Sequence, residues 1–234
     1  MDFTLPPEVE ETRLAIRAFV AEKLIPLESD RANYDDHENI DMDVLKEMQA
    51  DARAAGLWAL AMPKARGGRG FNTVGMAACY EEMNHSIFGP ACFNAAAPDD
   101  GNMFVLNKVA TDAQKEQWLQ PIIDGKVRSS IVMTEPAPGA GSDPGGMMLT
   151  RAEKKGDTWV VHGHKWYITG AAVADHFILL ARTSDDARRN LTAFLFHKDQ
   201  PGWEIIRRIP IMGPEEHGGH CELKFDGLEI PDEN

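Results

Sequence analysis

The first half of the chain places hydrophobic residues at the spacing of amphipathic helices. One predicted helix begins at Pro6 and Pro7, which suit a first helical turn, and ends at Pro26. A second begins with Asp41 as its N-cap and stops near Gly56, a residue that tolerates the left-handed C-cap conformation. The inward face of the first helix consists of Val9, Ile16, Phe19, Val20 and Leu24.

Two more helices are predicted before this pattern ends. One follows Thr73, with its apolar residues on one side. The other opens at Thr111 and Gln114, which form the S/T-x-x-E/Q pattern of a capping box, and it should end before Pro121. These stripes are most simply explained as core.

Beyond Lys126 the hydrophobic period shortens toward two, which is typical of strands. Segments 155–157 and 162–164, each centred on a glycine, are interpreted as connections between successive strands. The sequence therefore predicts an α+β chain: an all-α domain in residues 1–126, then an antiparallel β-barrel or sandwich domain in residues 127–234. Little room remains for parallel β-α-β units, which argues against a Rossmann fold. The predicted strands are residues 129–133, 158–161, 166–169, 177–181, 191–196 and 222–225.

Charge and composition restrict the classes of partner. The 234 residues carry a net charge of −13, so we expect no nucleic-acid partner. The N-terminus lacks the basic and apolar regions of a signal peptide, and no apolar run approaches the roughly 18 residues of a membrane span. We therefore expect a cytoplasmic protein with no membrane span. The odd number of cysteines, three, fits reduced thiols.

Two local motifs leave alternatives open. His217, His220 and Cys221 crowd three possible metal ligands together, but no second cluster completes a zinc spacing, so we predict no metal site. The glycine-rich segment 138–146 could bring backbone N–H groups close to a ligand, or it could be an ordinary hairpin loop. It lacks the glycine order and the strand-to-helix context of a dinucleotide fingerprint.

Several motifs together resemble the acyl-CoA dehydrogenase family. Met133-Thr-Glu-Pro136, Gly141-Ser-Asp143 and Lys165-Trp-Tyr-Ile-Thr-Gly170 are similar to the segments with which that family holds FAD. Matches to other family segments occur in order at residues 62–70, 111–121 and 228–231. Segments 97–103 and 217–220, the latter reading H-G-G-H, are similar to a subgroup of larger members.

The resemblance implies a role for individual residues. Thr134 would face the pyrimidine edge of the flavin, Thr169 would lie near the N5 edge that accepts a hydride, and Tyr167 would lie beside the ring system. Ser142 would contact both flavin and acyl-CoA, although the additional residues 137–138 precede it here. The complete set implied for cofactor binding is Ile131, Met133, Thr134, Gly141, Ser142, Tyr167, Ile168 and Thr169.

Each of these residues also has a purely structural interpretation. Thr134 could satisfy backbone groups at a strand end, Tyr167 could be a half-buried strand aromatic, and Ser142 could cap the turn at residues 143–144. Glu135 matches a structural position of the motif and is not assigned as a base. Arg182, Arg207 and Arg208 could meet CoA phosphates, but solvated surface is the simpler expectation.

The implied activity is FAD-dependent α,β-dehydrogenation of an acyl-CoA to a 2,3-enoyl-CoA, as in the β-oxidation of fatty acids. Electrons would pass to an electron-transfer flavoprotein. In the family the glutamate base lies in a C-terminal helical bundle, which we expect outside this chain, on a second chain or a lost segment, so no catalytic residue is assigned. We expect weakened FAD binding by the isolated chain and an oligomer in the complete enzyme. The alternative is a non-catalytic module for flavin binding, acyl-CoA binding or assembly.

Overall fold

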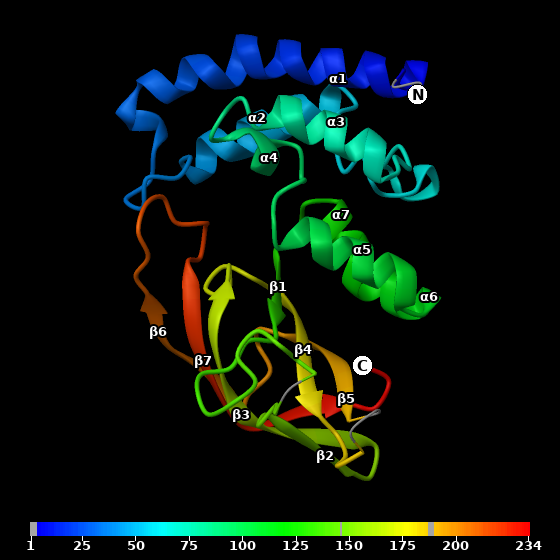
Figure 1. Cartoon of the computed structure of the whole chain (residues 1–234), viewed down its shortest axis with the longest axis vertical. Helices are drawn as coiled ribbons and strands as arrows, with labels where there is room; N and C mark the ends of the chain where they lie inside the picture. Colours follow the sequence, from blue (N-terminus) through cyan, green and yellow to red (C-terminus); the bar gives the residue numbers. More distant parts are fainter. Residues whose placement is uncertain (1–3, 146, 187–189) are drawn as a thin grey trace. The chain divides into compact units, whose positions relative to one another are not determined.

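The computed structural model describes residues 4–145, 147–186 and 190–234. The chain forms two compact units that divide between Ala110 and Thr111 (Figure 1). The first is helical and comprises α1 (Pro7–Phe19), a π turn (Val20–Leu24), 3-10 turns (Ile25–Ser29, Arg31–Asn33, Lys64–Arg66), α2 (Met42–Ala54), α3 (Thr73–Met83), α4 (Gly89–Cys92) and α5 (Asp99–Val109).

The helix boundaries follow the local chemistry that the sequence predicts. The Asp41 carboxylate accepts hydrogen bonds from the N–H groups of Asp43 and Val44, and α2 is followed by Gly56 at φ +69°. Asn72 caps α3 through its side chain. These caps satisfy N–H groups that have no partner inside the helix.

Buried Glu82 joins α1 to α3, which lie side by side in Figure 1. Its carboxylate accepts from the Nε and Nη2 of Arg17 at 2.9 and 2.7 Å, and it also pairs with Arg13. The hydrogen bond from Arg17 lowers the pKa of Glu82, and this effect exceeds the opposing effect of burial. The charge is therefore buried together with its partners, and it fixes how the two helices pack.

Two prolines are accommodated by π turns. Pro26 and Pro121 each follow a π turn, Val20–Leu24 and Lys115–Leu119 respectively. A proline lacks the N–H of a helix and clashes with the carbonyl four residues earlier, and the wider π turn accommodates both effects. The helix predicted to end before Pro121 therefore continues beyond it, and the chain stays helical past Pro26 as a 3-10 turn.

The second unit combines a short helical run with a seven-stranded sheet. The capping box predicted at Thr111 and Gln114 is present. The Gln114 side chain donates to the carbonyl of Glu233 at 2.7 Å, so this helical run belongs to the same compact unit as the strands. The elements are α6 (Asp112–Gln114), the π turn Lys115–Leu119, α7 (Gln120–Ile123), β1 (Ser129–Val132), β2 (Arg151–Lys155), β3 (Thr158–Thr169), β4 (His176–Arg182), β5 (Leu191–His197), β6 (Trp203–Ile209) and β7 (His220–Pro231).

The sheet is mixed, which corrects the expectation of a purely antiparallel domain. The strands follow the order β1-β4-β2-β3-β7-β6, with β5 paired to β4. Hairpins β2–β3, β4–β5 and β6–β7 are antiparallel, but β1 runs parallel to β4. The long segment between β1 and β4 supplies the crossover that a parallel pair requires, and adjacent hairpins need no such connection. The helical domain followed by a β domain is otherwise confirmed.

One predicted connection lies inside a strand. Residues 162–164 are part of β3, where Gly163 pairs with Phe225 of β7. A Cβ atom on Gly163 would lie 2.4 Å from the Thr150 hydroxyl, so glycine is needed here for close packing and not for a turn. The strands β2 and β6 were missed because their residues are mostly exposed and lack an apolar alternation. No helix in the described part of the chain is long and apolar enough to cross a membrane.

We predict that Glu82→Gln destabilises the helical unit. Loss of the charged acceptor should lower the free energy of unfolding by about 1.5–3 kcal/mol, as for hydrogen bonds to charged groups. Because the folded-state pKa of Glu82 is lowered, its contribution is complete above the ordinary carboxyl pKa and is lost as pH falls. Urea unfolding at several acidic pH values should show that the free energy of unfolding of the variant changes less with pH than that of the native chain. The control Glu81→Gln, at an exposed position, should leave both the free energy of unfolding and its pH dependence unchanged. Equal stability of the two variants would contradict the assignment.

Candidate functional site

A buried ion pair lies beneath the loop that follows β1. Glu135 is 2% exposed and Lys165 is 0% exposed, and the Lys165 Nζ lies 3.2 Å from the Glu135 carboxylate. Lys165 also donates to the carbonyl of Met133 at 2.8 Å. The pair therefore attaches the end of β1 to the middle of the sheet through β3.

Glu135 also accepts hydrogen bonds from the far end of the loop. The N–H groups of Leu149 and Thr150 reach its carboxylate at 2.7 and 2.8 Å. Burial by itself would raise the pKa of Glu135, but these bonds and the Lys165 charge hold it below its usual value. Burial lowers the pKa of Lys165 to about 8, although the Glu135 carboxylate opposes that shift. One carboxylate thus closes the loop over residues 135–150.

A β-bulge in β3 presents Tyr167 to solvent. Between Lys165 and Ile168 the pairing with β7 shifts by one residue. The Trp166 N–H leaves that ladder and donates to the Thr134 carbonyl at 3.1 Å. Tyr167 adopts φ +51°, which costs a residue other than glycine roughly 1–2 kcal/mol, and it is 47% exposed. A strained, exposed aromatic residue held by a bulge is a candidate ligand contact.

Thr169 is fixed at the end of the same strand. The Ser130 hydroxyl donates to the Thr169 carbonyl at 2.6 Å, and the Thr169 hydroxyl lies 3.0 Å from Nδ1 of His220. Because residues 130–134 bond to residues 165–169, the structure brings Thr134, Tyr167 and Thr169 into one region.

The remaining predicted residues take different positions around this region. Ile131 is 36% exposed on β1, whereas the Ile168 side chain is 1% exposed in the β core, so only its backbone can face a ligand. The Glu135 N–H donates to the Gly141 carbonyl at 3.0 Å, and Gly141 has φ +62°. Ser142 is exposed, and the adjacent turn is capped by Asp143, which accepts from Gly145. Apolar side chains beside hydroxyl groups and a glycine loop can hold a planar ring with polar edges.

Sequence reasoning missed Lys165 and His220 as parts of this site. Lys165 is part of a motif in the sequence, but its burial was not predicted. The available signal was a lysine placed between residues of a predicted strand.

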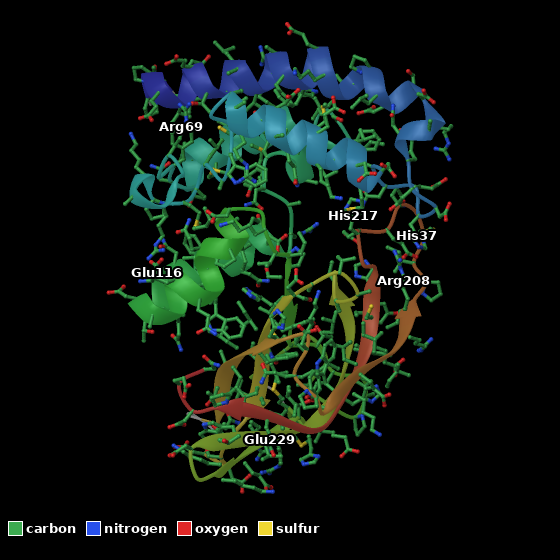
Figure 2. The ribbon with its side chains drawn as sticks, turned by 180° about the vertical axis from the view of Figure 1, so that it is seen from behind. His37, Arg69, Glu116, Arg208, His217 and Glu229 are labelled. Carbon is green, nitrogen blue, oxygen red and sulfur yellow. The ribbon has the colours of Figure 1, made fainter. Side chains whose placement is uncertain are left out.

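The possible metal ligands have other partners: Cys221 donates to the Gly218 carbonyl, and Nε2 of His220 lies 2.9 Å from Glu216. Among the described residues, no group of three or more His, Cys, Asp or Glu side chains could hold a metal ion. Figure 2 labels His217 at the entry to β7 and Arg208 on β6.

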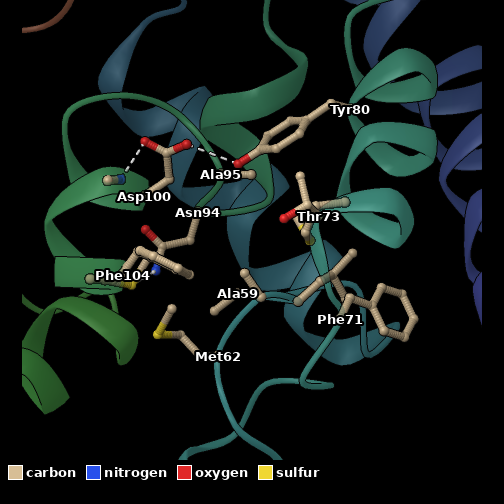
Figure 3. Close-up of a pocket in the computed structure, with 14 residues that line it drawn as sticks. Ala59, Met62, Phe71, Thr73, Tyr80, Asn94, Ala95, Asp100 and Phe104 are labelled. Carbon is tan, nitrogen blue, oxygen red and sulfur yellow. Dashed lines mark hydrogen bonds between the residues drawn. The ribbon is translucent and has the colours of Figure 1, made fainter. Parts of the chain in front are cut away.

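The helical unit contains a separate apolar cavity of about 280 Å³ (Figure 3). The Asp100 carboxylate forms its polar wall, accepting from the Tyr80 hydroxyl at 2.9 Å and from the Gly101 N–H at 2.6 Å. Burial and the Asp100 charge raise the pKa of Tyr80, so the phenol stays protonated as a donor. The apolar lining includes Leu60, Met62, Phe71, Met76, Ala95, Met103 and Phe104.

We predict that Glu135→Gln costs about 3–5 kcal/mol of unfolding free energy, because it leaves the Lys165 ammonium buried without its counter-charge. The double variant Glu135→Gln with Lys165→Met should lose less than the sum of the single variants, since it buries no unpaired charge. The matched control is Lys154→Met, which breaks an ion pair exposed on both sides and should cost less than about 1 kcal/mol. Chemical denaturation gives the free energy of unfolding of the two single variants, the double variant and the control. If the losses of the two single variants add up to the loss of the double variant, Glu135 and Lys165 are not directly coupled.

Comparisons with known proteins match both units. The acyl-CoA dehydrogenase N-terminal domain model matches residues 6–126, and the middle domain model matches residues 130–228. A relative from Mycobacterium tuberculosis named probable acyl-CoA dehydrogenase FadE2 is 32% identical, with 100% of this chain and 58% of its own length covered. Acyl-CoA dehydrogenase family member 11 from Gallus gallus is also 32% identical, with 96% of this chain and 30% of its own length covered.

Solved structures share the fold. A putative acyl-CoA dehydrogenase from Mycobacterium abscessus has a TM-score of 0.87 and 34% identity, covering 99% of this chain and 60% of that protein. Butyryl-CoA dehydrogenase from Megasphaera elsdenii has a TM-score of 0.76 and 26% identity, covering 100% and 59%. The chain thus spans less than two thirds of each of these relatives. Matches to both domain models over nearly its whole length show that the chain belongs to the acyl-CoA dehydrogenase family.

Proposed function

We propose that the chain provides the flavin-binding and acyl-binding parts of an FAD-dependent acyl-CoA dehydrogenase. The reaction would be α,β-dehydrogenation of an acyl-CoA thioester to a 2,3-enoyl-CoA. The observation that carries the proposal is the exposure of strained Tyr167 between Thr134 and Thr169, at the point where the Glu135–Lys165 pair attaches the loop to β3. Family membership supplies the reaction class.

The proposed cofactor contacts have distinct tasks. Bound FAD would supply a hydride acceptor at N5. Thr134 would donate to the pyrimidine edge, where negative charge collects, and Tyr167 would cover part of the ring system. Thr169 would face the N5 edge, and exposed Ser142 would contact flavin and acyl-CoA. The other proposed contacts are Ile131, Met133, Gly141 and the backbone of Ile168.

The proposed reaction needs a carboxylate base for the acyl α-proton, and we assign none in this chain. Glu135 is unsuited to that task because its buried carboxylate already accepts from Leu149, Thr150 and Lys165. Its lowered pKa further weakens it as a base. We propose that a glutamate outside this sequence removes the proton, on a C-terminal domain or a second chain.

The apolar cavity of the helical unit is the proposed site of the acyl chain. Its lining of methionine, phenylalanine and alanine matches a hydrocarbon. Gly101 also lines the cavity, and a Cβ on it would meet no atom within 4 Å.

The proposed partner that takes electrons from the reduced flavin is an electron-transfer flavoprotein, as in fatty-acid β-oxidation. The complete enzyme would be an oligomer. The three cysteines are free, buried thiols, which supports a reducing compartment such as the cytoplasm.

The first test is titration of FAD into the chain, followed by anaerobic addition of octanoyl-CoA. We expect weak binding without bleaching of the flavin, because we assign no base to the residues of this chain. Tyr167→Ala should weaken FAD binding roughly 10-fold, which corresponds to the 0.5–1.5 kcal/mol of an aromatic contact plus lost burial. The control is Ile206→Ala, whose side chain is also 47% exposed. Absence of FAD binding would refute the proposal, and bleaching would place a base within this chain. A bound flavin that never bleaches, even with a partner chain added, would favour a non-catalytic module.

A second test concerns the acyl cavity. Gly101→Leu should fill its edge and weaken octanoyl-CoA binding roughly 10-fold, with FAD binding unchanged, as measured by calorimetry. Gly101→Ala is the matched control: a Cβ there meets no atom within 4 Å, so it should leave affinity unchanged and stabilise α5 by about 0.5–1 kcal/mol. Equal acyl-CoA affinity of the leucine variant and the native chain would place the acyl chain elsewhere.

A further inference from the structure

A chain of three polar side chains ends at the Thr169 hydroxyl. Thr169 Oγ1 lies 3.0 Å from Nδ1 of His220, and Nε2 of the same ring lies 2.9 Å from the Glu216 carboxylate. The His220 side chain is 15% exposed and the Glu216 side chain is 51% exposed, so the series runs from the surface to the end of β3. The cofactor contacts proposed above use only its last member, Thr169.

The glycines of the H-G-G-H segment bring His220 to this position. Gly218 and Gly219 have φ +82° and +56°, in the left-handed region. A Cβ on Gly218 would lie 2.8 Å from the Gly170 carbonyl, and one on Gly219 would lie 2.0 Å from Nε of Arg208. The Gly170 N–H donates to the Gly219 carbonyl at 2.7 Å. The turn therefore holds His220 directly opposite Thr169 in the β3–β7 register.

The acceptor chemistry of Glu216 sets the direction of both hydrogen bonds. An ionised carboxylate can only accept, so the His220 tautomer that satisfies Glu216 is the one with its proton on Nε2. In that tautomer Nδ1 has a free lone pair, which accepts the Thr169 O–H. The single hydroxyl proton of Thr169 is then committed to His220, and the oxygen keeps two lone pairs that can accept hydrogen bonds. The nearby cation Arg208 is paired with Glu215, the residue next to Glu216.

We propose that His220, oriented by Glu216, is a positioning residue that makes Thr169 present a hydrogen-bond acceptor, not a donor, at the end of β3. The orientation of the Thr169 hydroxyl by His220 does not depend on the proposed function. Its consequence for the flavin N5 edge does rest on that function. Oxidised N5 can only accept a hydrogen bond, whereas reduced N5 carries a hydrogen and donates. A Thr169 hydroxyl that can only accept therefore favours the reduced cofactor over the oxidised one.

The hydrogen bond is tested in the chain without added cofactor by ¹⁵N NMR of the histidine rings. His220→Asn identifies the His220 signals. We expect the Nε2–H tautomer with an accepting Nδ1, and Thr169→Val should shift the Nδ1 resonance to the position of an unbonded nitrogen. Glu216→Ala should mix the tautomers, and the control Glu215→Gln should not. An Nδ1–H tautomer, or an Nδ1 signal indifferent to Thr169→Val, would overturn the proposal.

The consequence for the cofactor is tested by the midpoint potential of FAD bound to the chain. His220→Leu frees the Thr169 proton to donate to oxidised N5, so the equilibrium should move roughly 3–10-fold toward oxidised flavin, the size of one neutral hydrogen bond. In a Thr169→Val background the same change should have no effect. An equal shift in both backgrounds would refute action through Thr169. If the native chain binds no FAD, the proposed function fails, while the NMR result still decides the positioning role of His220.

Discussion

The second unit depends on a charge pair that has almost no contact with water. Glu135 and Lys165 lie in segments far apart in sequence, and each would be strongly unfavourable if buried alone. Once paired, they join the end of β1, the end of the glycine-rich loop and β3, through the Met133 carbonyl and the Leu149 and Thr150 N–H groups. The neighbouring Thr134 carbonyl accepts the Trp166 N–H, so the proposed contacts Thr134 and Tyr167 lie next to that attachment.

The bulge in β3 is the second constraint, and it begins directly after Lys165. With Lys165 directed into the core, the strand inserts one extra residue before Ile168 resumes pairing with β7. The Trp166 N–H reaches Thr134, and Tyr167 takes a left-handed backbone conformation in an exposed position. Backbone strain persists only where surrounding contacts enforce it, and the ladders on both sides of the bulge provide those contacts. The same strand end then places Thr169 opposite His220.

The helical unit uses the same physical device for a different purpose. Buried Glu82 satisfies Arg13 and Arg17 and fixes α1 against α3, so the apolar cavity lined by α3 and α5 has one rigid wall. The hydrogen-bonded Asp100–Tyr80 pair forms another part of the wall. In both units a paired buried carboxylate sets the geometry around the proposed site, and apolar packing supplies most of the stability.

The sequence by itself determined the order of the two units, the caps at Asp41 and Thr111, and the family motifs, because these signals are local and follow from hydrophobic period and side-chain chemistry. It did not determine the mixed sheet, the strand through Gly163 or the weakly patterned β2 and β6, since these depend on pairing between distant segments. Motifs named Thr134, Tyr167 and Thr169 as a group, but tertiary structure alone decided that Lys165 is buried, that Ile168 faces the core and that His220 meets Thr169. Side-chain direction near a bulge is set by long-range register, which no local pattern records.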